Sequence, residues 1–224
     1  MTIPDQHALK IAVANAAVKE VTPGSVLGVG TGSTVDLFID ALAASGIQLA
    51  AAVSSSIRSS GRLRSLGYKV IGLEQLDMPM DLYIDGADEI DSKLCMIKGG
   101  GAALTQEKIV ASAAKRFVCI VDASKRVDCL GKFPLPIEVI ESAITPVSWA
   151  IRALGGDPRR RPGVVTDNGH PILDVHGLAI ADPVAMETAL NQIPGVITNG
   201  VFALRRADVA LISSAAGVTR LTQN

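Results

Sequence analysis

The chain of 224 residues is 48% hydrophobic, which supports one large domain, or a main domain with a smaller companion, and excludes a disordered chain. Its 21 basic and 22 acidic side chains give a formal net charge of −1, so there is no basic field to bind nucleic acid. The three cysteines, Cys95, Cys119 and Cys129, are too few and wrongly spaced for a disulfide framework or a zinc site.

Targeting and membrane signals are also absent from the sequence. The N-terminal residues lack a basic segment followed by an apolar run, the pattern of a secretion signal. No apolar stretch reaches the roughly 18 residues needed to cross a bilayer, because Ser45, Gly46 and Gln48 interrupt the closest one. The histidines are scattered, which argues against a histidine metal site. We therefore expect a cytoplasmic protein with no membrane partner.

The first two-thirds of the sequence alternate between helical and strand patterns, which predicts a parallel sheet covered by helices on both faces. Glycine-containing turns separate the segments, and Ser33 is placed to cap the second helix. Helices are expected at 10–21, 34–44, 58–66 and 102–115, and strands at 25–29, 50–53, 69–73, 81–84 and 117–121.

The pattern changes after Lys132, where a proline-rich segment marks a domain boundary. The order that follows is β-α-β-β-α-β, and the turn Asp167-Asn168-Gly169 is a strong hairpin signal. A last apolar strand at 207–213 is expected to return to the first sheet. Strands are expected at 137–139, 163–165, 172–175 and 196–202, and helices at 145–154 and 183–192.

A glycine-rich turn, Gly28-Val29-Gly30-Thr31-Gly32-Ser33-Thr34, follows the first strand and opens a helix. Backbone amides at such a turn, aided by the helix dipole, favour a phosphate, and the hydroxyls add donors. The dinucleotide fingerprint and the nucleotide P-loop both fail to match. A tight turn of small residues that serves packing alone would show the same glycines.

A second motif, Asp85-Gly86-Ala87-Asp88-Glu89-Ile90-Asp91, places four acids in seven residues at the end of a strand. Ligands of open α/β sheets bind beyond the carboxyl ends of the strands, so Asp85 and Asp88 are expected to present two carboxylates to one cleft. The alternatives are a solvated acidic loop and a divalent-metal site, although the calcium-loop pattern is absent.

The most specific motif runs from Lys98 through Gly99, Gly100 and Gly101 into the helix that carries Glu107. Three consecutive glycines indicate backbone amides that face a ligand, next to a cation and a carboxylate. These are the groups that an enolisation needs. A flexible loop followed by an ordinary helix acid is the structural alternative.

Other polar or large side chains carry weaker signals. Lys125 ends the strand-turn Asp122-Ala123-Ser124-Lys125 and could meet a phosphate, but a surface lysine in a turn is the simpler interpretation. The run 159–161 of three arginines is expected to be a solvated loop, and Trp149 and Met186 are expected to pack in a core.

Together these stretches resemble the ribose-5-phosphate isomerases of the A type over nearly the whole chain. The resemblance implies a Rossmann-like domain at 1–132, a ferredoxin-like α+β lid domain at 133–204 and a return to the first domain at 205–224. The matching segments are GVGTGST (28–34), DGADEID (85–91), KGGGAALTQEKI (98–109), DASK (122–125), GKFPLPIEVI (131–140), GVVTDNG (163–169) and ILDVHG (172–177).

The resemblance also implies an activity and an assembly. The family interconverts ribose 5-phosphate and ribulose 5-phosphate through an enediolate, in the non-oxidative branch of the pentose phosphate pathway. It works without metal or cofactor, and its members are cytosolic homodimers or homotetramers.

Residue roles follow from the same resemblance. Glu107 matches the proton-shuttling base, Asp85 the acid linked to ring opening, and Asp88 and Lys98 contact the substrate hydroxyls and the intermediate. The remaining substrate-binding positions are Lys10, Thr31, Gly32, Ser33, Thr34, Gly86, Ala87, Gly99, Gly100, Gly101 and Lys125.

Two other functions remain open at the level of the sequence. A non-catalytic sugar-phosphate sensor would usually carry a DNA-binding helix-turn-helix, and the first expected strand begins at residue 25, which leaves little room for one. An acyl-group transferase on a related fold would use Glu107 as a nucleophile and would need a coenzyme A site.

Overall fold

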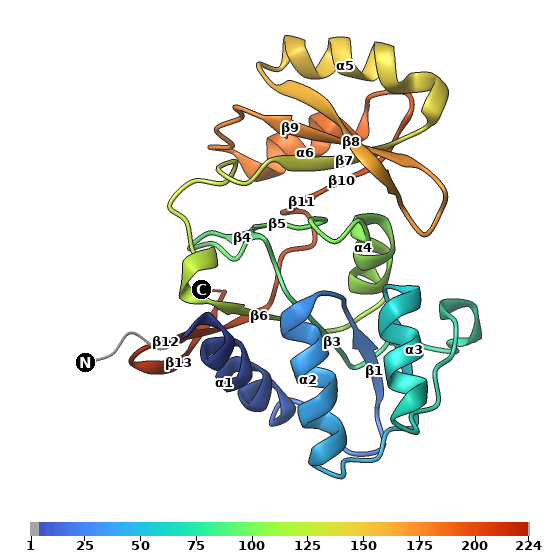
Figure 1. The fold of residues 1–224 in the computed structure, drawn as a ribbon, viewed down its shortest axis with the longest axis vertical. Coiled ribbons are helices and arrows are strands. Elements are labelled where there is room, and N and C mark those ends of the chain that lie inside the picture. Colours follow the sequence, from blue (N-terminus) through green and yellow to red (C-terminus); the bar gives the residue numbers. More distant parts are fainter. Residues whose placement is uncertain (1–4, 224) are drawn as a thin grey trace. The chain divides into compact units, whose positions relative to one another are not determined.

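The computed structural model describes residues 5–223, which divide into two compact units (Figure 1). Unit 1 holds the described residues up to Gly86, Ile109–Lys125 and those from Ala207 onward. Unit 2 holds Ala87–Lys108 and Arg126–Arg206. Each unit has its own hydrophobic core.

A sheet in the order β13-β12-β6-β3-β1-β2 forms the centre of unit 1. All neighbouring pairs are parallel except β12 with β13, which form an antiparallel hairpin. The strand expected at 207–213 is confirmed as β12, because it pairs with β6 in this sheet. The strands are β1 (Val26–Val29), β2 (Ala51–Ser54), β3 (Leu82–Asp85), β6 (Phe117–Asp122), β12 (Val209–Ser214) and β13 (Gly217–Thr222).

Three helices of unit 1 pack on these strands: α1 (Gln6–Val18), α2 (Ser33–Ala44) and α3 (Ile57–Ser65). Helices α1 and α2 lie side by side, and α3 lies against α2 and β2 (Figure 1). Their buried apolar side chains, such as Phe38 and Leu42 of α2, meet those of the buried strands. Strands β1 and β6 are apolar at successive positions because side chains on both faces of the sheet are buried.

The larger sheet of unit 2 is antiparallel, with the order β10-β7-β9-β8. Its chain order β7-α5-β8-β9-α6-β10 is the predicted β-α-β-β-α-β arrangement, and helices α5 and α6 pack on it through one apolar cluster. The elements are β7 (Leu135–Val139), α5 (Ile144–Ala153), β8 (Asp157–Val165), β9 (Pro171–His176), α6 (Pro183–Asn191) and β10 (Val196–Asn199).

A small antiparallel sheet of unit 2, in the order β11-β5-β4, was not predicted. It consists of β4 (Glu89–Ile90), β5 (Met96–Ile97) and β11 (Val201–Phe202). The single strand expected at 196–202 is therefore wrong, because the chain changes sheet at Gly200. A Cβ at Gly200 would lie 2.3 Å from the Lys98 carbonyl oxygen, so only glycine allows this crossing. Helix α4 (Leu104–Ser112) follows the small sheet and contributes residues to both units.

The α/β fold with a parallel central sheet is as predicted, but several local expectations are wrong. The segment 69–73 forms only an isolated bridge, between Ala52 and Val70, at the edge of the sheet. Ser33 does not cap α2, since it is the first helical residue and Gly32 occupies the cap position. Trp149 is 64% exposed rather than packed in a core.

The arginine run 159–161 is also not a loop, because it lies within strand β8. Short 3-10 helices connect other elements at Leu73–Gln75, Ala123–Lys125 and Glu141–Ala143. Within residues 5–223, no helix has both the length and the apolar character that a bilayer crossing requires.

Candidate active site

The motifs of unit 1 meet at one edge of its parallel sheet. Strands β6, β3 and β1 are neighbours and run in the same direction, so their carboxyl ends lie side by side. The turn after β1 is the glycine-rich motif, β3 ends at Asp85, and the turn after β6 leads to Lys125. This is the edge at which open α/β sheets bind ligands.

Asp85 is a fully buried carboxylate held by a set of donors. The Tyr83 hydroxyl donates to Oδ2 at 2.5 Å, and the backbone amides of Thr31 and Gly86 donate to Oδ1 at 3.1 and 2.7 Å. Tyr83 stands two residues before Asp85 on β3, so both side chains project from the same face of the strand. The sequence analysis missed Tyr83, although this spacing indicates a shared face.

The glycines of the first motif provide space for this pair. A Cβ at Gly30 would lie 1.9 Å from the Asp85 carboxyl carbon, and a Cβ at Gly28 would lie 2.9 Å from the Tyr83 ring. Gly32 instead needs its backbone freedom, since its φ is +106° at the start of α2. The glycines at 28 and 30 are therefore required by the close packing of strand β3, whether or not a ligand binds at this turn.

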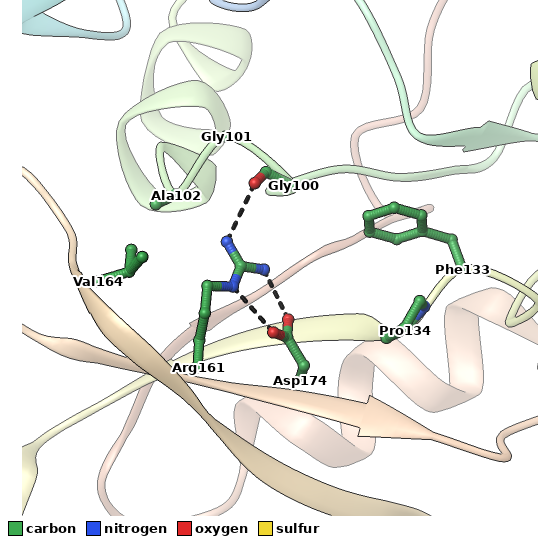
Figure 2. A pocket seen from close by; sticks show the side chains of 8 residues that line it. All are labelled: Gly100, Gly101, Ala102, Phe133, Pro134, Arg161, Val164 and Asp174. Atoms are coloured by element: carbon green, nitrogen blue, oxygen red, sulfur yellow. Dashed lines mark hydrogen bonds and ion pairs between the residues drawn. The ribbon is translucent and has the colours of Figure 1, made fainter.

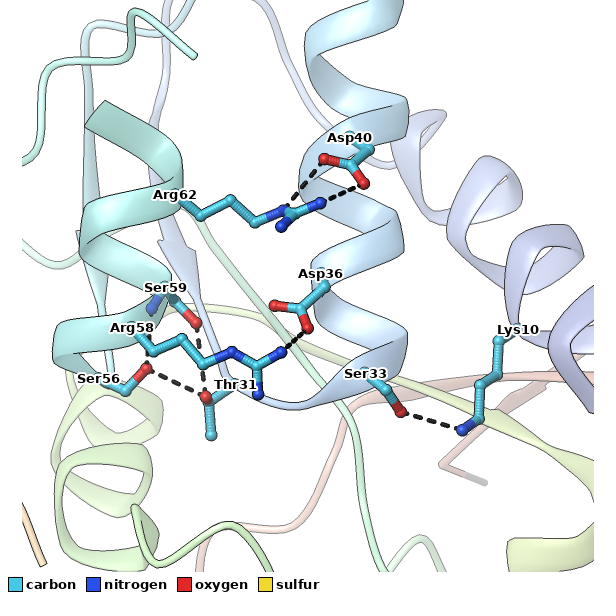
Figure 3. A network of polar contacts seen from close by, with 9 residues as sticks. All are labelled: Lys10, Thr31, Ser33, Asp36, Asp40, Ser56, Arg58, Ser59 and Arg62. Carbon is cyan, nitrogen blue, oxygen red and sulfur yellow. Dashed lines mark hydrogen bonds and ion pairs between the residues drawn. The ribbon is translucent and has the colours of Figure 1, made fainter. Parts of the chain in front are cut away.

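Hydroxyl and basic side chains surround the same turn (Figure 3). Lys10 Nζ donates to Ser33 Oγ at 2.9 Å, and Ser56 Oγ donates to Thr31 Oγ1 at 3.0 Å. Ser56 also caps α3, because its Oγ accepts from the Ser59 amide. Next to these contacts, Arg58 pairs with Asp36 of α2. Unit 1 thus brings Lys10, Thr31 and Ser33 together, with Ser56 as a contact that the sequence analysis had not assigned.

Lys125 closes the 3-10 turn that follows β6. Asp122 shapes this turn, since its Oδ1 accepts from the Ser124 amide at 2.9 Å and from the Ser124 hydroxyl at 2.5 Å. Gln6 of α1 donates to the other oxygen of Asp122 at 3.5 Å. The carboxylate fixes the turn, and Lys125 extends from its end.

In unit 2, Lys98 and Glu107 form a buried ion pair. Lys98 Nζ lies 3.3 Å from Glu107 Oε2, and the two side chains are only 3% and 4% exposed. Lys98 follows strand β5, its amide donates to the Gly200 carbonyl at 2.9 Å, and its Nζ lies 5.5 Å from the centre of the Phe202 ring. A charge pair removed from water is costly to build, and losing one partner costs about 3–5 kcal/mol.

Asp88 and the glycine loop are also joined within unit 2. The Gly100 amide, expected to face a ligand, donates to Asp88 Oδ2 at 2.8 Å. A Cβ at Gly100 would lie 2.7 Å from Asp88 Oδ1, and Gly99 has a φ of +103°. Two of the three glycines are therefore required by the fold itself: Gly100 by its close approach to Asp88, and Gly99 by its left-handed backbone.

Arg161 holds the opposite side of this loop (Figure 2). Its Nη1 donates to the carbonyls of Gly99 and Gly100 at 3.2 and 3.1 Å, and its guanidinium pairs in a bidentate manner with Asp174 of β9. Gly100, Gly101, Phe133, Arg161 and Asp174 help to line a pocket here. The sequence analysis missed this role because a run of arginines suggested a solvated loop.

The remaining acids of the second motif hold loops. Glu89 accepts from the amides of Gly131 and Phe133, at 2.8 and 2.5 Å, and Asp91 accepts from those of Lys93 and Cys95. Among residues 5–223, no group of three or more His, Cys, Asp or Glu side chains is arranged to bind a metal ion.

These motifs agree with a family of sugar-phosphate enzymes. Residues 51–217 match the family model of ribose 5-phosphate isomerase A (phosphoriboisomerase A). The chain belongs to the ribose 5-phosphate isomerase A family. The match covers most of the chain, including the Asp85–Asp88 motif, the glycine loop and Glu107.

Solved structures of ribose 5-phosphate isomerases resemble the whole chain. The enzyme from Neisseria gonorrhoeae is 45% identical, with a TM-score of 0.97 and complete coverage of both chains. That from Methanocaldococcus jannaschii is 39% identical, with a TM-score of 0.91 and coverage of 97% of this chain and all of the other. A D-ribose 5-phosphate isomerase in complex with phospho-erythronic acid is 37% identical, with a TM-score of 0.93 and coverage of 98% of this chain and all of the other.

Proposed function

We propose that Glu107 is the base of an aldose–ketose isomerisation. As a ribose 5-phosphate isomerase A, the chain interconverts D-ribose 5-phosphate and D-ribulose 5-phosphate, a step of the pentose phosphate pathway. Family membership favours this isomerase over the sensor and the acyl transferase. The complex of one relative with phospho-erythronic acid supports a sugar phosphate as the substrate.

The observation that carries the proposal is the buried pair of Lys98 and Glu107, which are 3.3 Å apart. The reaction removes a proton alpha to the carbonyl of the open-chain sugar and returns it to the neighbouring carbon. A single carboxylate can do both, because it accepts the proton and then donates it. The Lys98 ammonium stabilises the negative charge that develops on the enediolate oxygen, together with the amides of Gly99 and Gly101, since that of Gly100 donates to Asp88.

The other site residues act on the rest of the substrate. We assign ring opening to Asp85, whose carboxylate is held by Tyr83 and two amides. Asp88, with the backbone of Gly86 and Ala87, contacts the sugar hydroxyls. The phosphate is bound by Lys125, Lys10 and the turn Thr31–Gly32–Ser33–Thr34, where hydroxyls, amides and the N-terminus of α2 meet.

The compartment and the oligomeric state of the enzyme are further parts of the proposal. We propose a cytoplasmic homodimer or homotetramer that works without a cofactor. The near-neutral charge and the three cysteines support a reducing compartment without a nucleic-acid partner. Size-exclusion chromatography with light scattering tests the assembly, and a monomeric mass at assay concentration would overturn it.

Glu107→Gln tests the assignment of the base, since glutamine keeps the size and the polarity but cannot take up the proton. Loss of a general base costs roughly a hundredfold to ten-thousandfold, so kcat should fall by that factor while substrate still binds. Glu141→Gln is the matched control, because Glu141 is an exposed partner of Arg160.

The direct measurement is NMR of ribose 5-phosphate in deuterated solvent. The wild type should introduce solvent deuterium at C2, and Glu107→Gln should introduce almost none. A Glu107→Gln enzyme that isomerises near the wild-type rate would exclude Glu107 and transfer the role to Asp85 or Asp88.

A further inference from the structure

Helix α4, which carries Glu107, is bound to the rest of unit 2 by hydrogen bonds and an ion pair from the residues next to that glutamate. Thr105, Gln106 and Lys108 each bind a partner that lies far away in the sequence but within unit 2. None of the three has a role in the proposed chemistry.

The first fastening centres on Glu138, a carboxylate of β7 that is 0% exposed. Thr105 Oγ1 donates to its Oε2, while Thr166 Oγ1 and Asn168 Nδ2 donate to its Oε1 at 2.8 and 3.1 Å. Thr105 Oγ1 also lies 2.7 Å from Thr198 Oγ1 of β10. Glu138 thus joins the first turn of α4 to the sheet and to the β8–β9 hairpin.

Two further fastenings flank the same turn. Gln106 Nε2 donates to Asn168 Oδ1 at 2.9 Å. Lys108 Nζ donates to Glu187 Oε1 at 2.5 Å and to the Val201 carbonyl at 2.6 Å. Burial lowers the pKa of the Lys108 ammonium, and the neighbouring Glu187 carboxylate opposes this shift.

Helix geometry turns these contacts into a constraint on Glu107. Successive residues of an α-helix are rotated by about 100°, so residues 105 and 108 point to one side and residue 106 to another. Fastenings on two sides of one turn oppose both rotation of the helix about its axis and sliding along it. These contacts therefore restrain the point from which the Glu107 side chain leaves the helix, and with it the approach of Glu107 to Lys98.

Stability alone is a poor explanation for Glu138. A buried carboxylate satisfied by neutral donors gains less than well-packed apolar side chains would at the same position. What the carboxylate adds is direction, because it accepts from donors on two separate segments: Thr105 in the first turn of α4, and Thr166 and Asn168 in the β8–β9 turn. The hairpin turn at 167–169, which the chemistry does not use, contributes one of these donors.

We propose that Glu138 is a positioning residue that acts through Thr105 to hold the Glu107 carboxylate in its reactive orientation. This inference rests on the proposed role of Glu107 as the base. A displacement of about 1 Å in a reacting group can cost roughly a hundredfold in rate, so a loosened helix should lower kcat strongly.

Thr105→Val tests the proposal, because valine keeps the shape of threonine but removes the hydroxyl. We expect kcat to fall about tenfold to a hundredfold, with KM for ribose 5-phosphate within about twofold of the wild type. Thr188→Val is the matched control, since Thr188 is exposed on α6 and donates only to the carbonyl of Val184 among the described contacts. This control should keep the wild-type kcat.

The double variant Thr105→Val/Glu107→Gln separates positioning from general damage. If Thr105 acts through Glu107, the double variant should be no slower than Glu107→Gln alone. A wild-type kcat in Thr105→Val, an equal rise in KM, or a further full loss in the double variant would each overturn the inference. If Thr105→Val does not fold, Asn168→Ala at the exposed hairpin is measured by the same criteria.

The results that would refute the positioning role differ from those that would refute the proposed function. Glu107→Gln with near wild-type turnover would refute the base itself. A dead Glu107→Gln beside a fully active Thr105→Val would refute only the positioning role.

Discussion

Tyr83→Phe probes the support of Asp85 with the removal of a single oxygen atom. The Tyr83 hydroxyl donates to Asp85 Oδ2 at 2.5 Å in a buried environment, and the ring packs against Phe117 with centroids 4.8 Å apart. Phenylalanine keeps the ring contact and loses the hydrogen bond. A hydrogen bond to a charged group contributes about 1.5–3 kcal/mol to stability.

For a chain of this size each kcal/mol changes the midpoint of thermal unfolding by roughly 2–4 °C, so we expect a decrease of about 3–12 °C. Because Asp85 is the proposed ring-opening acid, kcat for ribose 5-phosphate should also fall. The assays are thermal unfolding followed by circular dichroism and turnover at a saturating concentration of substrate.

Tyr68→Phe is the matched control, since Tyr68 is the other of the two tyrosines in the chain. Its hydroxyl donates to a neutral acceptor, the carbonyl of Ile47, at 3.3 Å. This bond should contribute only about 0.5–1.5 kcal/mol, and its loss should leave kcat unchanged. A Tyr83→Phe enzyme that loses no more stability than Tyr68→Phe and keeps its turnover would refute the reasoning about Asp85.

Four other outcomes are expected. Turnover should survive a chelator such as EDTA, and a loss of activity that a divalent ion restores would contradict the proposal that the enzyme works without a metal. Lys125→Ala should raise KM for ribose 5-phosphate about 10- to 100-fold while Lys115→Ala leaves it unchanged, and equal KM values would remove Lys125 from the phosphate site. Burial, aided by Asp91, raises the pKa of Cys95 to about 11, so iodoacetamide at pH 8 should modify exposed Cys129 and spare Cys95. Because this raised pKa favours the protonated thiol in the folded state, stability should decrease as the pH rises toward 11, and a Cys95→Ala variant should lose less over that range.

Periodicity and turn chemistry predicted the architecture because both act locally. The turn 167–169 has residues that tolerate the required backbone, and the helix 183–191 begins with Asp182 accepting from the Ala185 amide. The β10–β11 break was not predictable in the same way. An apolar run from 196 to 202 fits one strand, and the reason for the break is a close approach to Lys98, which lies about a hundred residues earlier in the sequence.

The candidate site shows the same division between local and distant causes. The sequence pointed to Glu107, Lys98 and Asp85 as candidates because acids, lysine and glycines follow strands in recognisable order. Arg161 was not, since its role depends on the carbonyls of Gly99 and Gly100, and no pattern around 161 reveals those partners. Residues that support a site through tertiary contacts leave no periodic signal in the sequence.

The first glycine motif shows that one motif can serve packing and a candidate site together. From the sequence alone, a phosphate-binding turn and a tight turn that serves packing both fit its glycines. In the folded chain Gly28 makes space for Tyr83, Gly30 for Asp85, and only Gly32 adopts a left-handed backbone at the helix start. Because β1 and β3 are adjacent parallel strands, a side chain at Gly30 would displace the acid proposed to open the sugar ring. The segments 28–34 and 83–86 are therefore packed as one, so the turn proposed to bind the phosphate and the proposed acid are constrained together.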